Sequence, residues 1–236
     1  MAFARRLPAV LGLLVGAYGL VVRRRLLRWG ATDEKLSAPY PGADIVEGGK
    51  RGATMAVTVD APPSRVWPWL VQMGCDRAGW YSWDRLDNGG VASSAQIHPE
   101  WQDMSVGDHL ASSPGGSVWF EVVKVEPERF PALRASLDLR GAPFDVSGSR
   151  PRFFSDSLWA FRLEELAGEQ TRLVVSGYAC SNPRPLTAIG DFVFWEPAHW
   201  IMQTRQFANL KRRAERSSST AVNGPAELAR VGAATV

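Results

Sequence analysis

Alternating apolar and polar positions dominate the middle of the chain. Residues 54–60 read TMAVTVD, with Met55, Val57 and Val59 on one side of an extended backbone, which predicts a half-buried strand. The same period recurs in GDHLA, SVWFEVVKVE, ALRASLDL, SLWAFRLEEL and TRLVVSGYAC. The short LAGEQ link between the last two runs contains Gly168, so these two strands are expected to form an antiparallel hairpin.

Two other segments show the residue types and spacing of helices. APPSRVWPWLVQMG follows the first strand, and its internal Pro68 is expected to bend or split the helix. Residues 183–216 predict a long final helix, in which Pro197 should cause a kink or a restart. One strand, short helices, several antiparallel strands and a long last helix together describe an α+β fold.

Composition divides the chain into four parts. Residues 1–29 are expected to contain an apolar helix. Residues 30–52 are rich in Gly, Pro and acidic residues and show no hydrophobic period, so they are expected to form a linker. The folded domain is placed at residues 53–216. The Ser- and Ala-rich residues 217–236 are expected to be a disordered tail.

The N-terminal run LPAVLGLLVGAYGLVV, residues 7–22, carries no charge and is bracketed by arginines. As a helix it would span roughly 24 Å, slightly less than a hydrocarbon core of about 30 Å. Three arginines follow it where a signal peptide needs small residues, so an uncleaved membrane anchor is predicted. The heavier positive charge after the run predicts a cytoplasmic main domain. A buried or interfacial helix is the alternative.

The charge balance and the metal-binding residue types exclude two classes of function. Six arginines precede the first acid, Asp33, and without them the balance is 21 basic to 24 acidic residues. A slightly acidic domain does not predict nucleic-acid binding, which needs clustered cations. The three histidines lie far apart and the two cysteines match no ligand motif, so neither a metal nor a cofactor is expected.

The stretch GWYSWDRLDN, residues 79–88, combines aromatic rings with charged groups. A ligand pocket is typically lined by such rings and a few convergent polar groups, although most tryptophans of a chain simply fill its core. The predicted ligand-binding residues are Trp67, Trp80, Tyr81, Trp83, Asp84, Trp119, Trp159, Trp195, His199, Met202 and Gln203.

On the last helix, Glu196, His199 and Gln203 share one face because they are three and four residues apart. An imidazole facing an apolar space suits proton transfer near neutral pH, with Asp84 or Glu196 as partner. The structural alternative is that Glu196 caps the helix restart and His199 binds Asp84 or a backbone carbonyl.

Several blocks carry a family resemblance. VTVDAPPSRVWPWLVQMG, GWYSWDRLDN, VGDHL, WAFRLEEL and EPAHWIMQTRQFANLKRRAE together resemble the START-like (SRPBCC) superfamily, in its polyketide cyclase/dehydrase-like branch. The resemblance covers roughly residues 50–215. It implies a helix-grip fold, in which a curved antiparallel sheet of six or seven strands surrounds a long C-terminal helix and leaves an apolar cavity.

This resemblance leaves two functions open. The first is binding of a hydrophobic small molecule or lipid at the membrane surface, with residues 7–22 as the membrane contact. The second is a polyketide-type cyclase or dehydratase that uses His199 with Asp84 or Glu196. No catalytic motif carries over residue by residue, so the fold alone does not decide between them.

Overall fold

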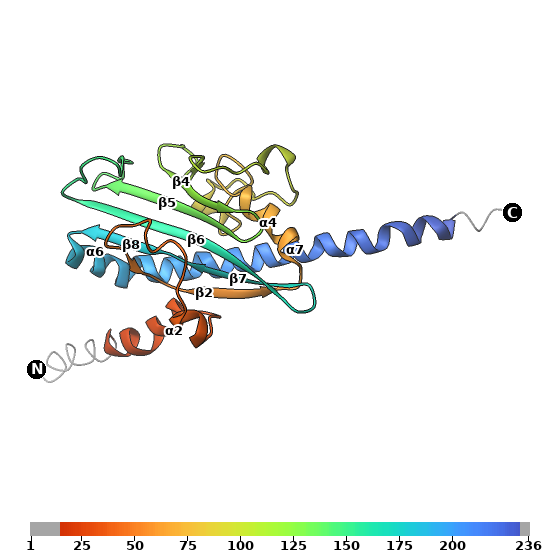
Figure 1. Ribbon diagram of the computed structural model, residues 1–236, viewed down its shortest axis with the longest axis horizontal. Helices are drawn as coiled ribbons and strands as arrows, with labels where there is room; N and C mark the ends of the chain where they lie inside the picture. The colour runs from red at the N-terminus through yellow and green to blue at the C-terminus, as the bar shows by residue number, and fades with distance from the viewer. Residues whose placement is uncertain (1–14, 232–236) are drawn as a thin grey trace, which may run out of the picture.

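The computed structural model describes the backbone of residues 15–231 and the side chains of residues 15–216. One eight-stranded antiparallel sheet curves over a long C-terminal helix (Figure 1). The strands are β1 (Lys50–Arg51), β2 (Met55–Val59), β3 (His109–Ala111), β4 (Trp119–Glu126), β5 (Phe130–Asp138), β6 (Phe154–Leu166), β7 (Gln170–Ser176) and β8 (Tyr178–Asn182). This architecture confirms the predicted helix-grip fold.

The sheet follows the order β1-β8-β6-β5-β4-β3, and β7 pairs with both β6 and β2. Leu166 lies opposite Gln170, which confirms the predicted β6–β7 hairpin. The run TRLVVSGYAC, predicted as one strand, divides at Gly177 into β7 and β8. A Cβ atom at Gly177 would lie 1.7 Å from the carbonyl oxygen of Leu158, so only glycine fits where the chain crosses β6. This division and the short β1 raise the number of strands above the six or seven expected.

The remaining elements are helical. They are η1 (Tyr18–Val22), α2 (Arg23–Leu27), α3 (Asp33–Ser37), α4 (Pro63–Val71), α5 (Asp84–Asp87), η2 (Pro99–Trp101), α6 (Arg184–Gly190), η3 (Asp191–Trp195) and α7 (Glu196–Val231). α4 is not split, since Pro68 removes only one backbone donor. Before Pro197 the final helix passes through the π-helical turn η3 and α7 then begins, which agrees with the predicted restart.

Two apolar clusters cover the two faces of the sheet. The inner face packs on α4 and α7 through buried residues that include Phe161, Leu173 and Phe207. The outer face carries a smaller cluster that includes Tyr40 and Val46. The Tyr40 hydroxyl lies 2.8 Å from the carbonyl oxygen of Ala160. The segment predicted as a linker therefore packs against the sheet, because burying Tyr40 and Val46 covers strands that would otherwise expose apolar side chains.

The N-terminal apolar run is only partly described. Residues 7–14 lie outside the described part of the chain, whereas residues 15–22 are helical and continue into α2. Within the described residues, no helix is both long enough and apolar enough to span a bilayer. The membrane anchor at residues 7–22 and the cytoplasmic placement therefore stay predictions.

The last helix is longer than the sequence suggested. α7 runs to Val231, so the backbone of residues 217–231 is helical where the composition indicated a disordered tail. Local propensity does not account for this extension, because the segment contains Gly224 and Pro225. Continuing a helix that is already formed costs less than starting a new one. Residues 232–236 lie outside the described part.

Candidate functional site

The last helix is fastened to the aromatic stretch at residues 80–82 by a series of hydrogen bonds. The Gln206 amide donates to the carbonyl oxygen of Trp80 (2.9 Å), and the Asn209 amide donates to that of Tyr81 (2.8 Å). The Ser82 hydroxyl donates to the carbonyl oxygen of Met202 (3.1 Å). These contacts hold the irregular chain around Trp80 against one side of α7. They also provide donors for backbone carbonyl groups that this buried loop would otherwise leave unpaired.

Four aromatic rings meet on the inner face beside this junction. The centroid of the Trp159 ring lies 5.5 Å from that of Trp80, 5.6 Å from that of Phe120 and 4.8 Å from that of Phe161. The indole N–H of Trp159 donates to Gln203 Oε1 (3.2 Å), which fixes the ring relative to α7. Trp80 and Phe161 are buried, whereas Phe120 and Trp159 keep some accessible surface. The cluster therefore lies at a boundary between a closed and an accessible region.

On one side of this boundary the interface between sheet and helix is closed. We call this region the packed half and define it by the residues of α7 from Gln203 to Ala214 and the strands they contact. Phe207 and Ala214 have no accessible surface and Leu210 has 1%. Large side chains face them from the sheet, including Leu173 and Phe161. The packed half is an ordinary apolar core.

On the other side the inner face carries small side chains. We call this region the open half and define it by α6, η3 and α7 up to Met202, with the strand residues Ala135, Ser155, Ser157, Ala179 and Ser181. Pairing aligns these five on one face, since Ser157 lies opposite Ala135 and Ala179, and Ser155 lies opposite Ser181 and the larger Leu137. No residue of α6 or η3 is buried. α6 meets the sheet at β8, where the Thr187 hydroxyl lies 2.7 Å from that of Ser181.

His199 belongs to the open half. Gln203, one turn later on α7, contacts Trp159, so His199 also faces the sheet. Burial lowers the pKa of the His199 imidazole, because the charged form is poorly solvated there. Within the described residues His199 makes no hydrogen bond, yet its nitrogens are not among the buried unsatisfied atoms. A neutral, unbonded imidazole is therefore available to a bound molecule.

The two carboxylates expected beside His199 have other partners. Glu196 accepts two hydrogen bonds from Arg23, at 2.5 and 2.7 Å. Asp84 accepts bonds from the backbone N–H of Ser93 (3.1 Å) and from its hydroxyl (2.5 Å). Neither carboxylate bonds His199 among the described contacts. The predicted His199 dyad is thus not assembled, because each acid is satisfied by a nearer cation or loop donor.

The structure separates the other predicted site residues into two groups. Trp80, Trp159, Met202 and Gln203 lie at or next to the aromatic cluster. Tyr81 is buried in the packed half and its hydroxyl accepts a bond from Gln72 (2.7 Å). Trp67 is half-buried against the core. Trp83, Trp119 and Trp195 point elsewhere: Trp83 is exposed under Arg205, Trp119 stacks on His109, and Trp195 is exposed.

Asp87 is not among the predicted site residues, and the structure buries its side chain. Both of its carboxylate oxygens are buried and neither makes a hydrogen bond of good geometry. Burial raises the pKa of Asp87, the Ser82 hydroxyl opposes this rise, and the nearby charge of Asp84 adds to it. The Cys75 thiol donates to the Asp87 carbonyl oxygen at 2.7 Å. An aspartate before Asn88 and two glycines is typical of a turn, so its burial could not be predicted from the local sequence.

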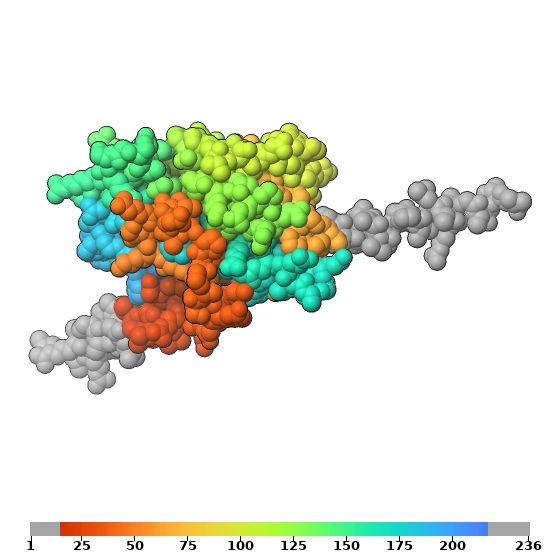
Figure 2. All heavy atoms as spheres, viewed as in Figure 1, coloured from red at the N-terminus to blue at the C-terminus, as the bar shows by residue number. Residues whose placement is uncertain are grey.

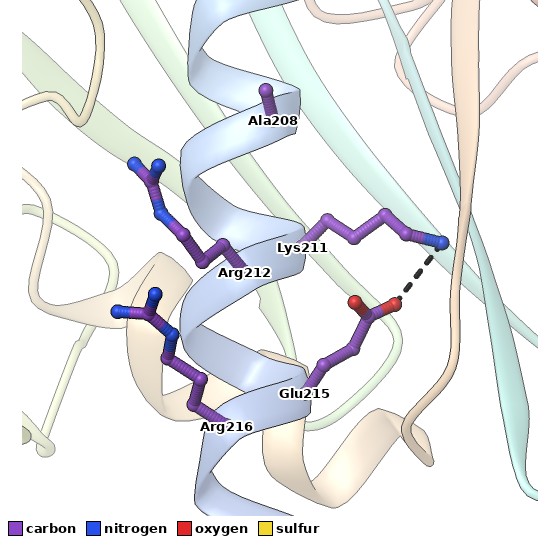
Figure 3. Close-up of a pocket in the computed structure, with 5 residues that line it drawn as sticks. All are labelled: Ala208, Lys211, Arg212, Glu215 and Arg216. Atoms are coloured by element: carbon purple, nitrogen blue, oxygen red, sulfur yellow. Dashed lines mark ion pairs between the residues drawn. The ribbon is translucent and has the colours of Figure 1, made fainter.

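An open groove of about 490 Å³ runs along the C-terminal side of the packed half (Figure 3). It is lined by Ala208, Lys211, Arg212, Glu215 and Arg216. Lys211 pairs with Glu215 at 3.0 Å and with Asp60 at 3.2 Å. Figure 3 shows the two arginine side chains on the other side of the helix from this pair. The charged lining of this groove does not suit an apolar molecule.

Metal chemistry finds no support in the described part of the chain. Within it, no three His, Cys, Asp or Glu side chains come close enough together to hold a metal ion. Cys75 and Cys180 are both free thiols.

Comparisons with known proteins place the chain only broadly. No protein-family model and no curated protein matches it. A solution structure of a protein from Arthrobacter aurescens is 15% identical and covers 70% of this chain and 86% of that one, with a TM-score of 0.40. DynU16, from the dynemicin biosynthetic locus, is 19% identical over 69% of this chain and 46% of its own, with a TM-score of 0.38. CalU16 from Micromonospora echinospora is 16% identical over 72% and 87%, with a TM-score of 0.34.

At these scores and identities the similar structures carry no argument about function. The helix-grip fold rests on this chain's own sheet and last helix. The narrower assignment to a polyketide cyclase/dehydrase-like branch stays a prediction.

Proposed function

We propose that the protein binds a hydrophobic small molecule or lipid between the inner face of the sheet and the first part of its last helix. The supporting observation is the contrast along that helix. No residue of α6 or η3 is buried, whereas Phe207, Leu210 and Ala214 are fully enclosed. A sheet that is closed against one part of a helix and lined with small side chains below the other leaves room for a ligand there.

The side chains around this space define the class of ligand. Phe120, Trp159 and Met202 offer apolar, partly accessible surface. Ser157 and the neutral His199 supply a few hydrogen-bonding groups. Apolar walls with few polar groups suit a largely hydrophobic molecule that carries one or two polar atoms. None of these residues carries a charge that would pair with a strongly charged ligand.

Binding is a better reading than catalysis. A cyclase or dehydratase would need a proton-transfer partner beside His199, and both candidate partners bond elsewhere. The desolvated imidazole can instead accept or donate one hydrogen bond to a bound molecule.

The proposal is tested by filling the space. The purified chain is incubated with a lipid extract, washed, and its retained molecules are identified by mass spectrometry. Ser157→Trp places a large ring over the small-residue surface and is expected to reduce retention at least about tenfold. Leu139→Trp, at a position 77% exposed, is the matched control and should retain as much as the unmodified chain.

Two results would contradict ligand binding at this place. One is an unmodified chain that retains no molecule after exposure to the extract. The other is a Ser157→Trp variant that remains folded, by its circular dichroism, and retains the same molecules in the same amount.

A further inference from the structure

Large apolar side chains are exposed along α6 and η3. Leu186, Ile189 and Val193 follow helical spacing, and Leu186 and Val193 are each 68% exposed. Phe194 and Trp195 come next, 61% and 63% exposed, and their rings contact each other at 5.2 Å between centroids. A soluble monomer rarely exposes so much contiguous apolar surface, so a partner is expected for it.

The N-terminal helix extends this apolar surface. Tyr18 packs edge-on against Phe192, with ring centroids 5.0 Å apart, and its hydroxyl donates to the Phe192 carbonyl oxygen (3.3 Å). Arg23 and Glu196 form an ion pair one turn further along. The exposed side chains of Val15, Leu20, Val21 and Val22 thus lie at the same end of the molecule as α6 (Figures 1 and 2).

Cations surround this end of the molecule. Arg24, Arg25 and Arg184 are exposed, and Arg152 is joined to the start of α6 because its carbonyl oxygen accepts a bond from Asn182. The neighbouring acids offer little opposing charge. Glu196 is paired with Arg23, and the charge of Asp191 is partly offset by the nearby Arg184 and Arg23. An apolar centre with a cationic rim is the pattern of a helix that lies in the interface of an anionic membrane.

The sequence before the described residues indicates the same partner. Residues 7–14 continue the uncharged run that ends beside η3, and Arg5 and Arg6 precede it. A protein partner would not require this uncharged continuation. A bilayer accommodates it together with the exposed rings of Phe194 and Trp195, because aromatic side chains favour the interface.

We propose that α6 and η3 form a membrane-docking surface. Leu186, Ile189, Val193, Phe194 and Trp195 enter the interface of an anionic bilayer beside residues 15–22. Arg24, Arg25 and Arg184 contact the headgroup phosphates. This proposal concerns the outer surface of the final helix, so it goes beyond ligand binding in the open half and can fail independently of it.

Docking through this surface would also orient the open half. The Ser181 hydroxyl lies 2.7 Å from that of Thr187 on α6, so the small-residue surface of the sheet is at the same end as the exposed stripe. A hydrophobic ligand could then pass from the bilayer to the protein without crossing water.

The test locates the lipid contact on the full chain. The protein is mixed with phosphatidylglycerol/phosphatidylcholine vesicles that contain a photoactivatable phospholipid, irradiated, digested and mapped by mass spectrometry. Crosslinks are expected in the peptide that contains residues 185–201. Because residues 7–22 alone could hold the chain on a vesicle, the measured quantity is labelling of this peptide and not sedimentation.

Variants make the test specific. The double variant Val193→Glu with Trp195→Glu should lower labelling of the peptide at least about tenfold, since each carboxylate opposes insertion. Leu139→Glu is the control at an exposed apolar position outside the surface and should leave labelling unchanged. Both variants should melt as the unmodified chain does, because all three positions are exposed.

Three results would overturn the proposal. In the first, residues 7–22 are labelled and the 185–201 peptide is not. In the second, labelling is equal on pure phosphatidylcholine vesicles, which would remove the role of the arginine rim. In the third, the double variant converts a dimer into a monomer in light scattering and leaves lipid labelling unchanged, which would identify a self-association surface.

Discussion

The packed half and the open half of the helix–sheet interface use the same helix in different ways. In the packed half, Phe207 and Leu210 meet large strand residues, and the amides of Gln206 and Asn209 bind loop carbonyls. In the open half, the strands present Ala135, Ser157 and Ala179, and the helix buries nothing over α6 and η3. The difference indicates that stability is concentrated in one half, which leaves the other free for binding.

The largest effect is expected in the packed half. Phe207→Ala should lower the free energy of unfolding by about 3–5 kcal/mol, because it leaves a cavity where the ring has no accessible surface. Trp195→Ala, in the open half, should change it by less than about 0.5 kcal/mol. Chemical denaturation measures both. Equal losses in the two variants would show that the two halves do not differ as described.

The polar contacts of the packed half are expected to contribute next. Gln206→Ala removes the donor to the Trp80 carbonyl oxygen and the acceptor of the Gln203 amide (2.8 Å). Leaving these buried groups unpaired should cost about 1–3 kcal/mol in the same denaturation experiment. Thr204→Ala, on a half-buried part of the same helix, is the control. If Gln206→Ala were as stable as the unmodified chain, the loop at residues 80–82 would be held by its apolar contacts alone.

Asp87 should make stability depend on pH. Its pKa is raised by burial, so the folded state binds a proton that the unfolded state has already released. Stability of the unmodified chain should therefore rise as pH falls from the raised pKa towards the ordinary value of about 3.9. Asp87→Asn should be more stable at neutral pH by about 1 kcal/mol, and this gain should shrink on acidification. A gain that is independent of pH would exclude the carboxylate as its source.

The smallest expected effect concerns His199. Its pKa is lowered by burial, so stability should fall as pH drops below the unfolded value of about 6.5, when the unfolded imidazole takes up a proton and the folded one does not. Titration followed by NMR should place the His199 midpoint below that value, and a bound apolar molecule should lower it further. An unchanged midpoint after ligand loading would place the ligand away from His199.

Sequence periodicity predicted the strands and an α+β class, and the family resemblance supplied the helix-grip arrangement. The alternation in residues 54–60 and in the later runs became β2 to β8, and the LAGEQ link became the β6–β7 hairpin. These features depend on local preference and on a side-chain period of two, which a sequence displays directly. The packing of Tyr40 on the outer face could not be predicted, because a short irregular segment has no hydrophobic period.

The site could be predicted only as a set of residue types. Strand spacing places Trp159 on the inner face, where its indole N–H bonds Gln203 of the last helix. The role of His199 in a ligand site stays a prediction. The partners of Glu196 and Asp84 could not be predicted, because Arg23 is far from Glu196 in sequence and Ser93 lies in an irregular loop. Polar groups pair with whichever donor the fold brings near.

The sequence by itself determined the strands, the long final helix and the apolar character of the N-terminus, because these follow from local spacing and composition. Only the tertiary structure decided that the helix is buried along one half and exposed along the other, that Asp87 is enclosed, and that η3 lies beside the N-terminal helix. Each of these depends on contacts between residues distant in the chain, whose closeness is a property of the folded whole.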